Sequence, residues 1–236
     1  DIDSSPNTNK YTYYDDISDI TYLNSSFYTT NYDLSGNAGE QIDLIVYDIV
    51  DTETVMNNKF SLGLNGQGYL SITNDGNDLF LQSRSNYNIF KISNTGEIAY
   101  LSSDTLDTKW LPSGLTYNSS NDSLVFLYRN TEKNNQYRLR EVSKLLSEQS
   151  KNDREFVLNG LDTTVYGALC IAYKEPNLYV LAFDGQEDVL ITMDYSSLNL
   201  ISNESVNDST AVGIDIANNS IYLSYRDRTI SLFKEL

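Results

Sequence analysis

The sequence has no histidine among its 236 residues, and only one cysteine and three prolines. Without histidine, the chain cannot build Ser-His-Asp or Cys-His nucleophilic sites, His-ligated zinc or haem held by histidine. The lone cysteine, Cys170, excludes an intrachain disulfide, and its apolar strand-like surroundings predict a buried small side chain. No run approaches about eighteen apolar residues, so we expect no membrane insertion.

Basic residues are also few: 16 Lys and Arg stand against 33 Asp and Glu, a net charge of −17. Such a charge argues against a nucleic-acid partner and against an anionic membrane surface. The hydrophobic content of 40% is enough for a folded core. The chain opens at Asp1 with a polar stretch, as a secreted protein does after signal cleavage, although a domain of a longer chain would look the same. We therefore expect an extracellular, periplasmic or cell-surface location.

A repeat with a period near 46 residues runs along the chain. Four segments begin at or near Gly68, Gly114, Gly167 and Gly213, with spacings of 46, 53 and 46 residues, and a fifth begins near Ser18. In each unit an apolar strand, a turn rich in Asn, Asp and Gly, and further alternating strands follow. A repeat of about 45 residues with four antiparallel strands is typical of a β-propeller blade.

The repeat predicts an all-β, five-bladed β-propeller, in preference to a β-sandwich, whose strands lack a four-strand repeat. The last unit runs out after three strands, while a lone aromatic strand, 10–14, precedes the first unit. We predict that this N-terminal strand completes the last blade beside 229–233 and so pairs an open edge. An insertion at 144–149 is expected to form one or two helical turns. The predicted single domain, 1–236, has blades at 17–64, 65–110, 111–163, 164–209, and 210–236 plus 10–15.

The sequence of one predicted blade resembles that of known propeller families. The runs 111–118 (LPSGLTYN) and 121–126 (NDSLVF) resemble a blade of the SdiA-regulated and NHL-type propellers. That resemblance implies the fold and a central funnel with loops for ligands or protein partners. A count of five blades also resembles arabinanase- and invertase-type glycosidases and tachylectin-type sugar-binding propellers.

Ligands of propellers bind at the entrance of the central channel, which the innermost strands line. Alignment of the blades on the repeat glycine places a ring of mostly neutral polar side chains there. The nineteen tyrosines of the chain supply flat faces with hydroxyl groups, which suit sugar or protein recognition. Trp110 is expected to be a packing anchor at the turn into the third blade. The candidate ligand-binding residues at the channel mouth are Asp16, Gln67, Tyr69, Ser113, Tyr166 and Thr210.

An enzymatic alternative needs two carboxylates about 5–9.5 Å apart over a sugar. Asp15, Asp16 and Asp19 come from one blade, and Asp208 or Asp215 would have to supply the second carboxylate. A chain with 33 acids places several near any rim by chance, so no catalytic residue is assigned.

No cofactor is expected, although calcium is conceivable in the acidic loops 74–78 and 184–188. Turn formation is the preferred interpretation of both loops.

The sequence therefore favours a non-catalytic binding or assembly module, secreted or on a cell surface, that recognises a protein or glycan through one face of the ring. One alternative is a carbohydrate-active hydrolase. The other is a structural module of a surface or viral adhesin, within a larger assembly.

Overall fold

The fold is taken from a computed structural model, which describes residues 16–32, 42–50, 53–64, 70–83, 87–93, 97–103, 108–133, 135–144, 152–159, 168–206 and 210–236. In these residues the secondary structure is all β, in five antiparallel sheets. The first three sheets are β1 (Asp16–Leu23), β2 (Ser26–Tyr32), β3 (Asp43–Val50) and β4 (Glu53–Ser61); β5 (Leu70–Asn74), β6 (Leu79–Ser83), β7 (Asn88–Ile92) and β8 (Ile98–Ser103); and β9 (Trp110–Asn118), β10 (Ser123–Asn130), β11 (Gln136–Ser143) and β12 (Asn152–Val157). The last two are β13 (Ala168–Lys174), β14 (Asn177–Phe183), β15 (Asp188–Asp194) and β16 (Leu200–Ser205); and β17 (Ala211–Ala217), β18 (Ser220–Tyr225) and β19 (Ile230–Glu235).

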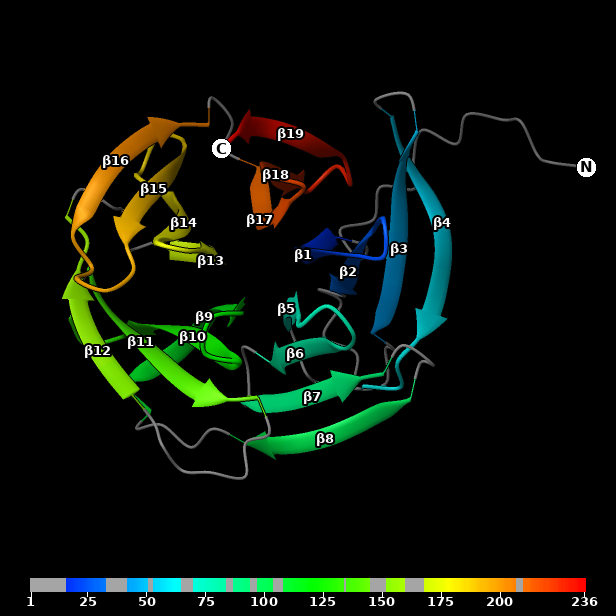
Figure 1. The fold of residues 1–236 in the computed structure, drawn as a ribbon, viewed down its shortest axis with the longest axis horizontal. Helices are drawn as coiled ribbons and strands as arrows, with labels where there is room; N and C mark the ends of the chain where they lie inside the picture. Colours follow the sequence, from blue (N-terminus) through cyan, green and yellow to red (C-terminus); the bar gives the residue numbers. More distant parts are fainter. Residues whose placement is uncertain are drawn as a thin grey trace, which may run out of the picture.

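The sheets stand around a central axis as the blades of a propeller (Figure 1). The first strand of each sheet is innermost, and these strands touch in a closed order: β1 against β5, β5 against β9, β9 against β13, β13 against β17, and β17 against β1. The prediction of a five-bladed, all-β propeller is therefore confirmed. The blade limits drawn from the sequence stay a prediction, because several joints between sheets lie outside the described residues.

The core is divided into five clusters, one at each junction between neighbouring blades. Strands such as β10 and β14 are buried along most of their length because both of their faces pack against a neighbouring blade. Trp110 lies at the junction of blades two and three and is 1% exposed, which confirms it as a packing residue. Cys170 is buried as predicted.

Among the described residues, a β-bulge interrupts the pairing of the innermost strand with its neighbour in four blades, the exception being the blade of β5, which is described only from Leu70. Counting back from the hairpin turns, Gly114 and Gly213 occupy equivalent positions, as the sequence alignment assumed, and the bulged residues before them are Ser113 and Val212. In blade four, however, the register places Cys170 at the glycine position and Leu169 in the bulge. The aligned Gly167 therefore precedes the equivalent position by three residues.

Two predicted segments fall outside the described residues: the closing strand 10–14 and, beyond Lys144, the helical insertion 144–149. Where the first and last blades meet, the hydroxyl of Thr54 in β4 accepts a hydrogen bond from the N–H of Ile230 in β19 (2.9 Å) and donates one to the carbonyl of Ile230 (3.2 Å). Among the described residues the last sheet has three strands, so the fourth-strand prediction stands as a prediction.

Candidate functional site

Side chains of the innermost strands form hydrogen bonds between neighbouring blades around the axis. Asp215 in β17 accepts hydrogen bonds from the N–H of Tyr22 (2.6 Å) and the hydroxyl of Thr21 (3.1 Å) in β1. Thr116 occupies the equivalent place in β9, two residues after Gly114, and its hydroxyl accepts the N–H of Tyr173 in β13 (3.1 Å). Burial raises the pKa of Asp215 to about 6, despite those hydrogen bonds.

The position four residues before each hairpin turn faces the neighbouring inner strand. A Cβ atom at Gly114 would lie 3.0 Å from the N atom of Ile171, and one at Gly213 only 2.8 Å from the Cα of Asp19. At the same position, the thiol of Cys170 donates to the carbonyl of Val212 (2.9 Å). The repeat glycine is thus explained by the close approach of two backbones.

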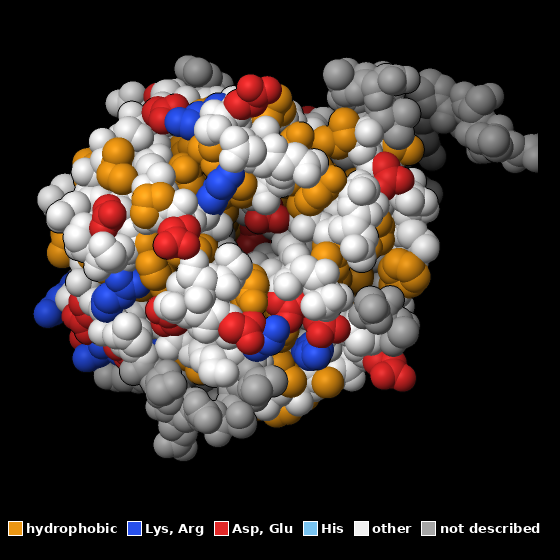
Figure 2. Space-filling view, in the orientation of Figure 1, with side chains coloured by type: hydrophobic (Ala, Val, Ile, Leu, Met, Phe, Trp, Pro, Cys, Tyr) orange, Lys and Arg blue, Asp and Glu red, His pale blue; other side chains and the backbone are white. Residues whose placement is uncertain are grey.

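The carboxylates considered for catalysis hold strands together. Asp19 is 1% exposed and accepts hydrogen bonds from the N–H groups of Ile20 (3.0 Å) and Ile72 (3.4 Å). Asp215 is engaged with β1 in the same way. Asp15 and Asp208 lie outside the described residues. Figure 2 shows acidic side chains deep in the hollow at the centre of the ring.

The predicted channel-mouth residues are only partly described. Ser113 is 5% exposed in the bulge of β9, whereas Thr210 is exposed, and its carbonyl accepts the N–H of Arg226 (3.0 Å). Asp16 begins β1 opposite Tyr32. The remaining three, Gln67, Tyr69 and Tyr166, lie outside the described residues, and their role in a site stays a prediction.

A polar and aromatic cluster, which the sequence analysis missed, lies at the opposite ends of the inner strands. This rim cluster surrounds the β9–β10 and β13–β14 turns and comprises Asp75, Tyr117, Asn118, Ser120, Asn121, Asp122, Ser123, Glu141, Lys144, Tyr173, Glu175 and Tyr195. In Figure 2 acidic and basic side chains gather over the area that β5, β6, β9 and β10 occupy in Figure 1. A sequence signal for it exists in the Asn- and Ser-rich turn 118–123, which was interpreted only as a hairpin turn.

Glu141, in β11, is the acceptor at the centre of the rim cluster. Its Oε1 accepts hydrogen bonds from Asn118 (3.0 Å), Asn121 (3.0 Å) and Ser123 (2.5 Å), and its Oε2 accepts one from the hydroxyl of Tyr195 (3.0 Å). Burial alone would raise the pKa of Glu141, but these donors outweigh it and lower the pKa. Glu141 is therefore held as a carboxylate.

Lys144 joins the turns of blades two and three. Its ammonium group lies 3.0 Å from Asp75 and 2.8 Å from Asp122, and the hydroxyl of Tyr117 donates to Asp122 (2.5 Å). The hydrogen bonds to Asp122 and Asp75 raise the pKa of Lys144, while burial and the bond to Asp122 raise the pKa of Tyr117 to about 12. All of these groups keep one protonation state near neutral pH.

The blade-four side of the cluster is built on Tyr195. The Arg154 guanidinium lies 4.4 Å from the centre of its ring and also donates to its carbonyl (2.5 Å), while Tyr173 meets the ring edge-on at 4.7 Å. Nearby, the hydroxyl of Ser120 donates to Glu175 (2.5 Å) across the gap between the two turns. Burial first, and then the negative charge of Glu141, raise the pKa of Tyr195. The result is a surface of tyrosines, carboxylates and amides fixed by their own contacts.

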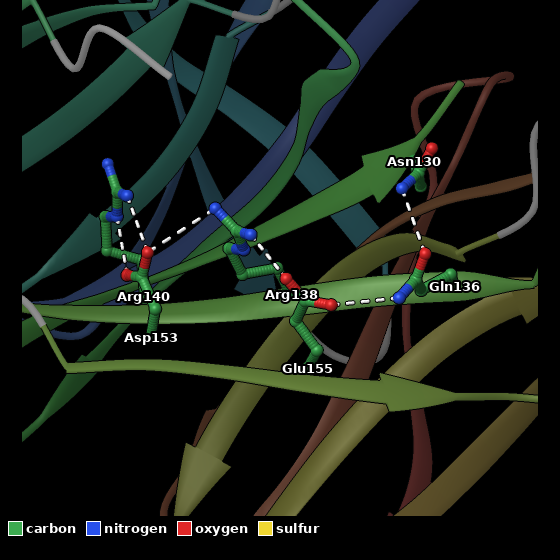
Figure 3. A network of polar contacts seen from close by, with 6 residues as sticks. All are labelled: Asn130, Gln136, Arg138, Arg140, Asp153 and Glu155. Atoms are coloured by element: carbon green, nitrogen blue, oxygen red, sulfur yellow. Dashed lines mark hydrogen bonds and ion pairs between the residues drawn. The ribbon is translucent and has the colours of Figure 1, made fainter. Parts of the chain in front are cut away.

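A second polar network lies in blade three and is shown in Figure 3. Arg140 donates two hydrogen bonds of 2.7 Å to Asp153, its cross-strand neighbour. Arg138 donates one hydrogen bond to Glu155, its own cross-strand neighbour, and one to Asp153 (3.5 Å). Arg138 also lies over the ring of Trp110, 4.3 Å from its centre. Since opposite charges directly across a strand pair stabilise it, this network holds the outermost strand β12 in place.

The two acidic loops are turns. Asp75 Oδ1 accepts the N–H groups of Asn77 (3.0 Å) and Asp78 (2.9 Å), and Asp184 Oδ1 accepts those of Gln186 (2.8 Å) and Glu187 (3.0 Å). In the described part of the chain, no group of three or more Cys, Asp and Glu side chains is arranged to hold a metal ion. No helix there is long and apolar enough to cross a membrane.

No protein-family profile and no curated protein matches this sequence. Among solved structures, that of glutaminyl cyclase from Myxococcus xanthus is similar, with a TM-score of 0.58 and 11% identity over 94% of this chain and 92% of that chain. A protein of unknown function from Bacteroides thetaiotaomicron has a TM-score of 0.56 and 13% identity over 89% of this chain, which spans 57% of that protein. At these identities the similarity establishes the propeller fold alone, and it confirms the resemblance to propeller proteins at that level.

Proposed function

We propose that this chain is a non-catalytic binding module, acting outside the cell or at its surface, that recognises a protein or glycan through the face of the ring bearing the rim cluster. Tyrosines, amides and carboxylates in fixed positions are the groups that such recognition uses. Contacts with surrounding residues of the cluster hold the side chains of Glu141, Lys144 and Tyr195 in place. This face therefore loses little conformational freedom when it binds a ligand.

One observation carries the proposal: the acids and bases of the rim cluster are held by contacts within it, since Glu141 accepts four hydrogen bonds and Lys144 bridges Asp75 and Asp122. In these surroundings the pKa values of Glu141, Asp75 and Asp122 are lowered, and those of Lys144 and Tyr117 are raised. A general acid or base works best with a pKa near the working pH. The rim cluster is therefore suited to hold a ligand rather than to transfer protons.

Asp215 favours the alternative, a carbohydrate-active hydrolase, because a pKa of about 6 is suitable for a general acid. Against it, the carboxylate of Asp215 accepts hydrogen bonds from two groups of β1, and Thr116 makes an equivalent bond between blades three and four without a carboxylate. We assign Asp215 to blade-to-blade contact, and keep hydrolysis as the second candidate.

The test is a glycan array, followed by measurement of affinity for each ligand found. Tyr173→Ala and Glu175→Gln should weaken binding about tenfold or more, because both side chains belong to the rim cluster. Tyr100→Ala is the matched control: Tyr100 is 58% exposed on β8 and lies outside the cluster. Equal loss in all three variants would contradict the proposed face. Turnover of chromogenic glycosides that Asp215→Asn abolishes would establish the hydrolase instead.

A further inference from the structure

The exposed hydrophobic side chains of this protein lie away from the rim cluster. Among the described residues, every exposed large hydrophobic side chain belongs to the third or fourth strand of a blade or to the C-terminal end of the chain. The three tyrosines of the cluster, Tyr117, Tyr173 and Tyr195, are half-buried. The centre of a protein–protein interface is rich in apolar and aromatic groups and poor in charged ones. The rim cluster instead presents carboxylates, amides and hydroxyls, so it is better suited to a polar ligand.

The charges of the rim cluster nearly cancel once the basic groups beside it are included. Lys144 lies between two of its carboxylates. On the blade-four side, the Arg154 guanidinium stacks on a tyrosine ring, and Lys174 donates to Asn219. Four carboxylates thus stand against three cations: Asp75, Asp122, Glu141 and Glu175 against Lys144, Arg154 and Lys174. With so little net charge, Coulomb attraction gives neither a cationic nor an anionic ligand a large advantage.

The hydrogen-bonding groups that the cluster leaves open are acceptors. Asp122 binds both of its partners in the cluster through Oδ1, so its Oδ2 has no partner in the described part of the chain. Glu175 likewise binds Ser120 through Oε2 alone, and Asn121 uses its NH₂ group but not its carbonyl oxygen. The Asp122 side chain is 60% exposed, and Asn121 and Glu175 are exposed too. A ligand for these three oxygens has to donate hydrogen bonds.

Sugar hydroxyl groups meet both requirements. They donate hydrogen bonds without bringing a charge, and a bond from a hydroxyl to a carboxylate is stronger than one between neutral groups. Tyr173, two residues before Glu175, adds a half-buried ring, held edge-on at 4.7 Å from the ring of Tyr195, for the apolar side of a sugar. Resting on the binding role proposed for this face, we infer that its ligand is an uncharged saccharide whose hydroxyls donate to Asn121, Asp122 and Glu175.

The test compares three kinds of soluble probe by titration calorimetry with the full chain: uncharged oligosaccharides of hexoses and N-acetylhexosamines, their sialylated and sulfated forms, and an oligolysine peptide. At least one uncharged saccharide should bind. Its dissociation constant should change less than about twofold between about 0.05 M and about 0.5 M NaCl, because salt screens interactions between charged partners. Glu175→Gln and Asp122→Asn should each raise this constant about tenfold or more, since each replaces a charged acceptor by a neutral one.

Glu132→Gln is the matched control. It makes the same change in an exposed turn at the other end of β10 and should leave the affinity unchanged. Circular dichroism and thermal melting of each variant exclude unfolding as the cause of a loss. Failure of every uncharged saccharide to bind at millimolar concentration would overturn the saccharide assignment. Binding of only the charged saccharides or the peptide, weakened by Glu175→Gln, would overturn it too, but would leave the proposed binding face intact. A saccharide whose affinity neither rim variant changes would contradict both, because its site would lie elsewhere.

Discussion

Asp215 in β17 accepts a hydrogen bond of 2.6 Å from the backbone N–H of Tyr22 in β1, a residue 193 positions earlier in the chain. This contact joins the last blade to the first. It completes a circle of contacts between inner strands that includes the bonds of Asp19 to Ile72 and Thr116 to Tyr173. The acidic side chains of the inner strands discussed here, Asp19 and Asp215, thus form hydrogen bonds that join neighbouring blades.

The pKa of Asp215 predicts that stability depends on pH. The folded-state pKa of about 6 lies above the unfolded value of about 3.9, so the folded state holds the proton more tightly. Asp215 therefore stabilises the fold at low pH, and this contribution is lost as pH rises through about 6, by at most about 3 kcal/mol. Urea unfolding at pH 4 and pH 7 measures most of it. Asp215→Asn should flatten this difference, and an unchanged pH dependence in that variant would contradict the assignment.

Gly213→Ala should destabilise the ring more than Gly114→Ala. A Cβ atom at Gly213 meets the Cα of Asp19 and the N atom of Ile20 at 2.8 Å, whereas at Gly114 the nearest atom is 3.0 Å away. Overpacking against backbone costs about 2–3 kcal/mol at the first site and about 1 kcal/mol at the second. Thermal and chemical denaturation give both values, with exposed Ser119→Ala as the control. A neutral Gly213→Ala would show that the two strands can separate without cost.

Asp153→Ala should loosen β12, because Arg140 is only 6% exposed and loses two hydrogen bonds. The expected cost is about 1–3 kcal/mol. Glu155→Gln is the matched comparison. The Glu155 side chain is 43% exposed, so the loss of its negative charge should lower the free energy of unfolding by less than about 1 kcal/mol. Trp110, the single tryptophan, lies against Arg138 in the same blade, so its fluorescence follows unfolding at this junction. Equal effects of the two variants would count against the role given to burial.

Deletion of residues 1–15 should lower the melting temperature, if the N-terminal strand completes the last blade as predicted. The described last sheet has three strands, and Thr54 occupies the outer backbone groups of Ile230 only. An added strand would pair the rest of that edge. Calorimetry of the truncated and full chains tests this, and identical melting curves would rule the closing strand out.

The repeat, the turns and most strands could be predicted from the sequence because period-2 alternation and Asn- and Gly-rich turns are local signals. The equivalence of positions in blade four could not, because Cys170 occupies the place of the repeat glycine there and an unrelated glycine, Gly167, stands three residues earlier. Leu169, not Tyr166, therefore aligns with Ser113. The rim cluster was also missed, since it unites residues as distant as Asn118, Glu141 and Tyr195. In both repeats the residue two positions after the glycine, Gly114 or Gly213, is a hydrogen-bond acceptor. This shared spacing is visible in the sequence, and it would have identified Asp215 as a hydrogen-bond partner of the next blade.

The bond between Asp215 and Tyr22 has a consequence for how the protein is made. A ribosome delivers Tyr22 first, and the carboxylate that meets its N–H emerges only after 192 further residues. Until then the first blade exposes one flank, including Ile20 and Phe27, which later pack against Ala217 and Ile230. Contacts of such long range form slowly, so the newly synthesised chain is most vulnerable to aggregation shortly before the strands of the last sheet, β17 to β19, appear.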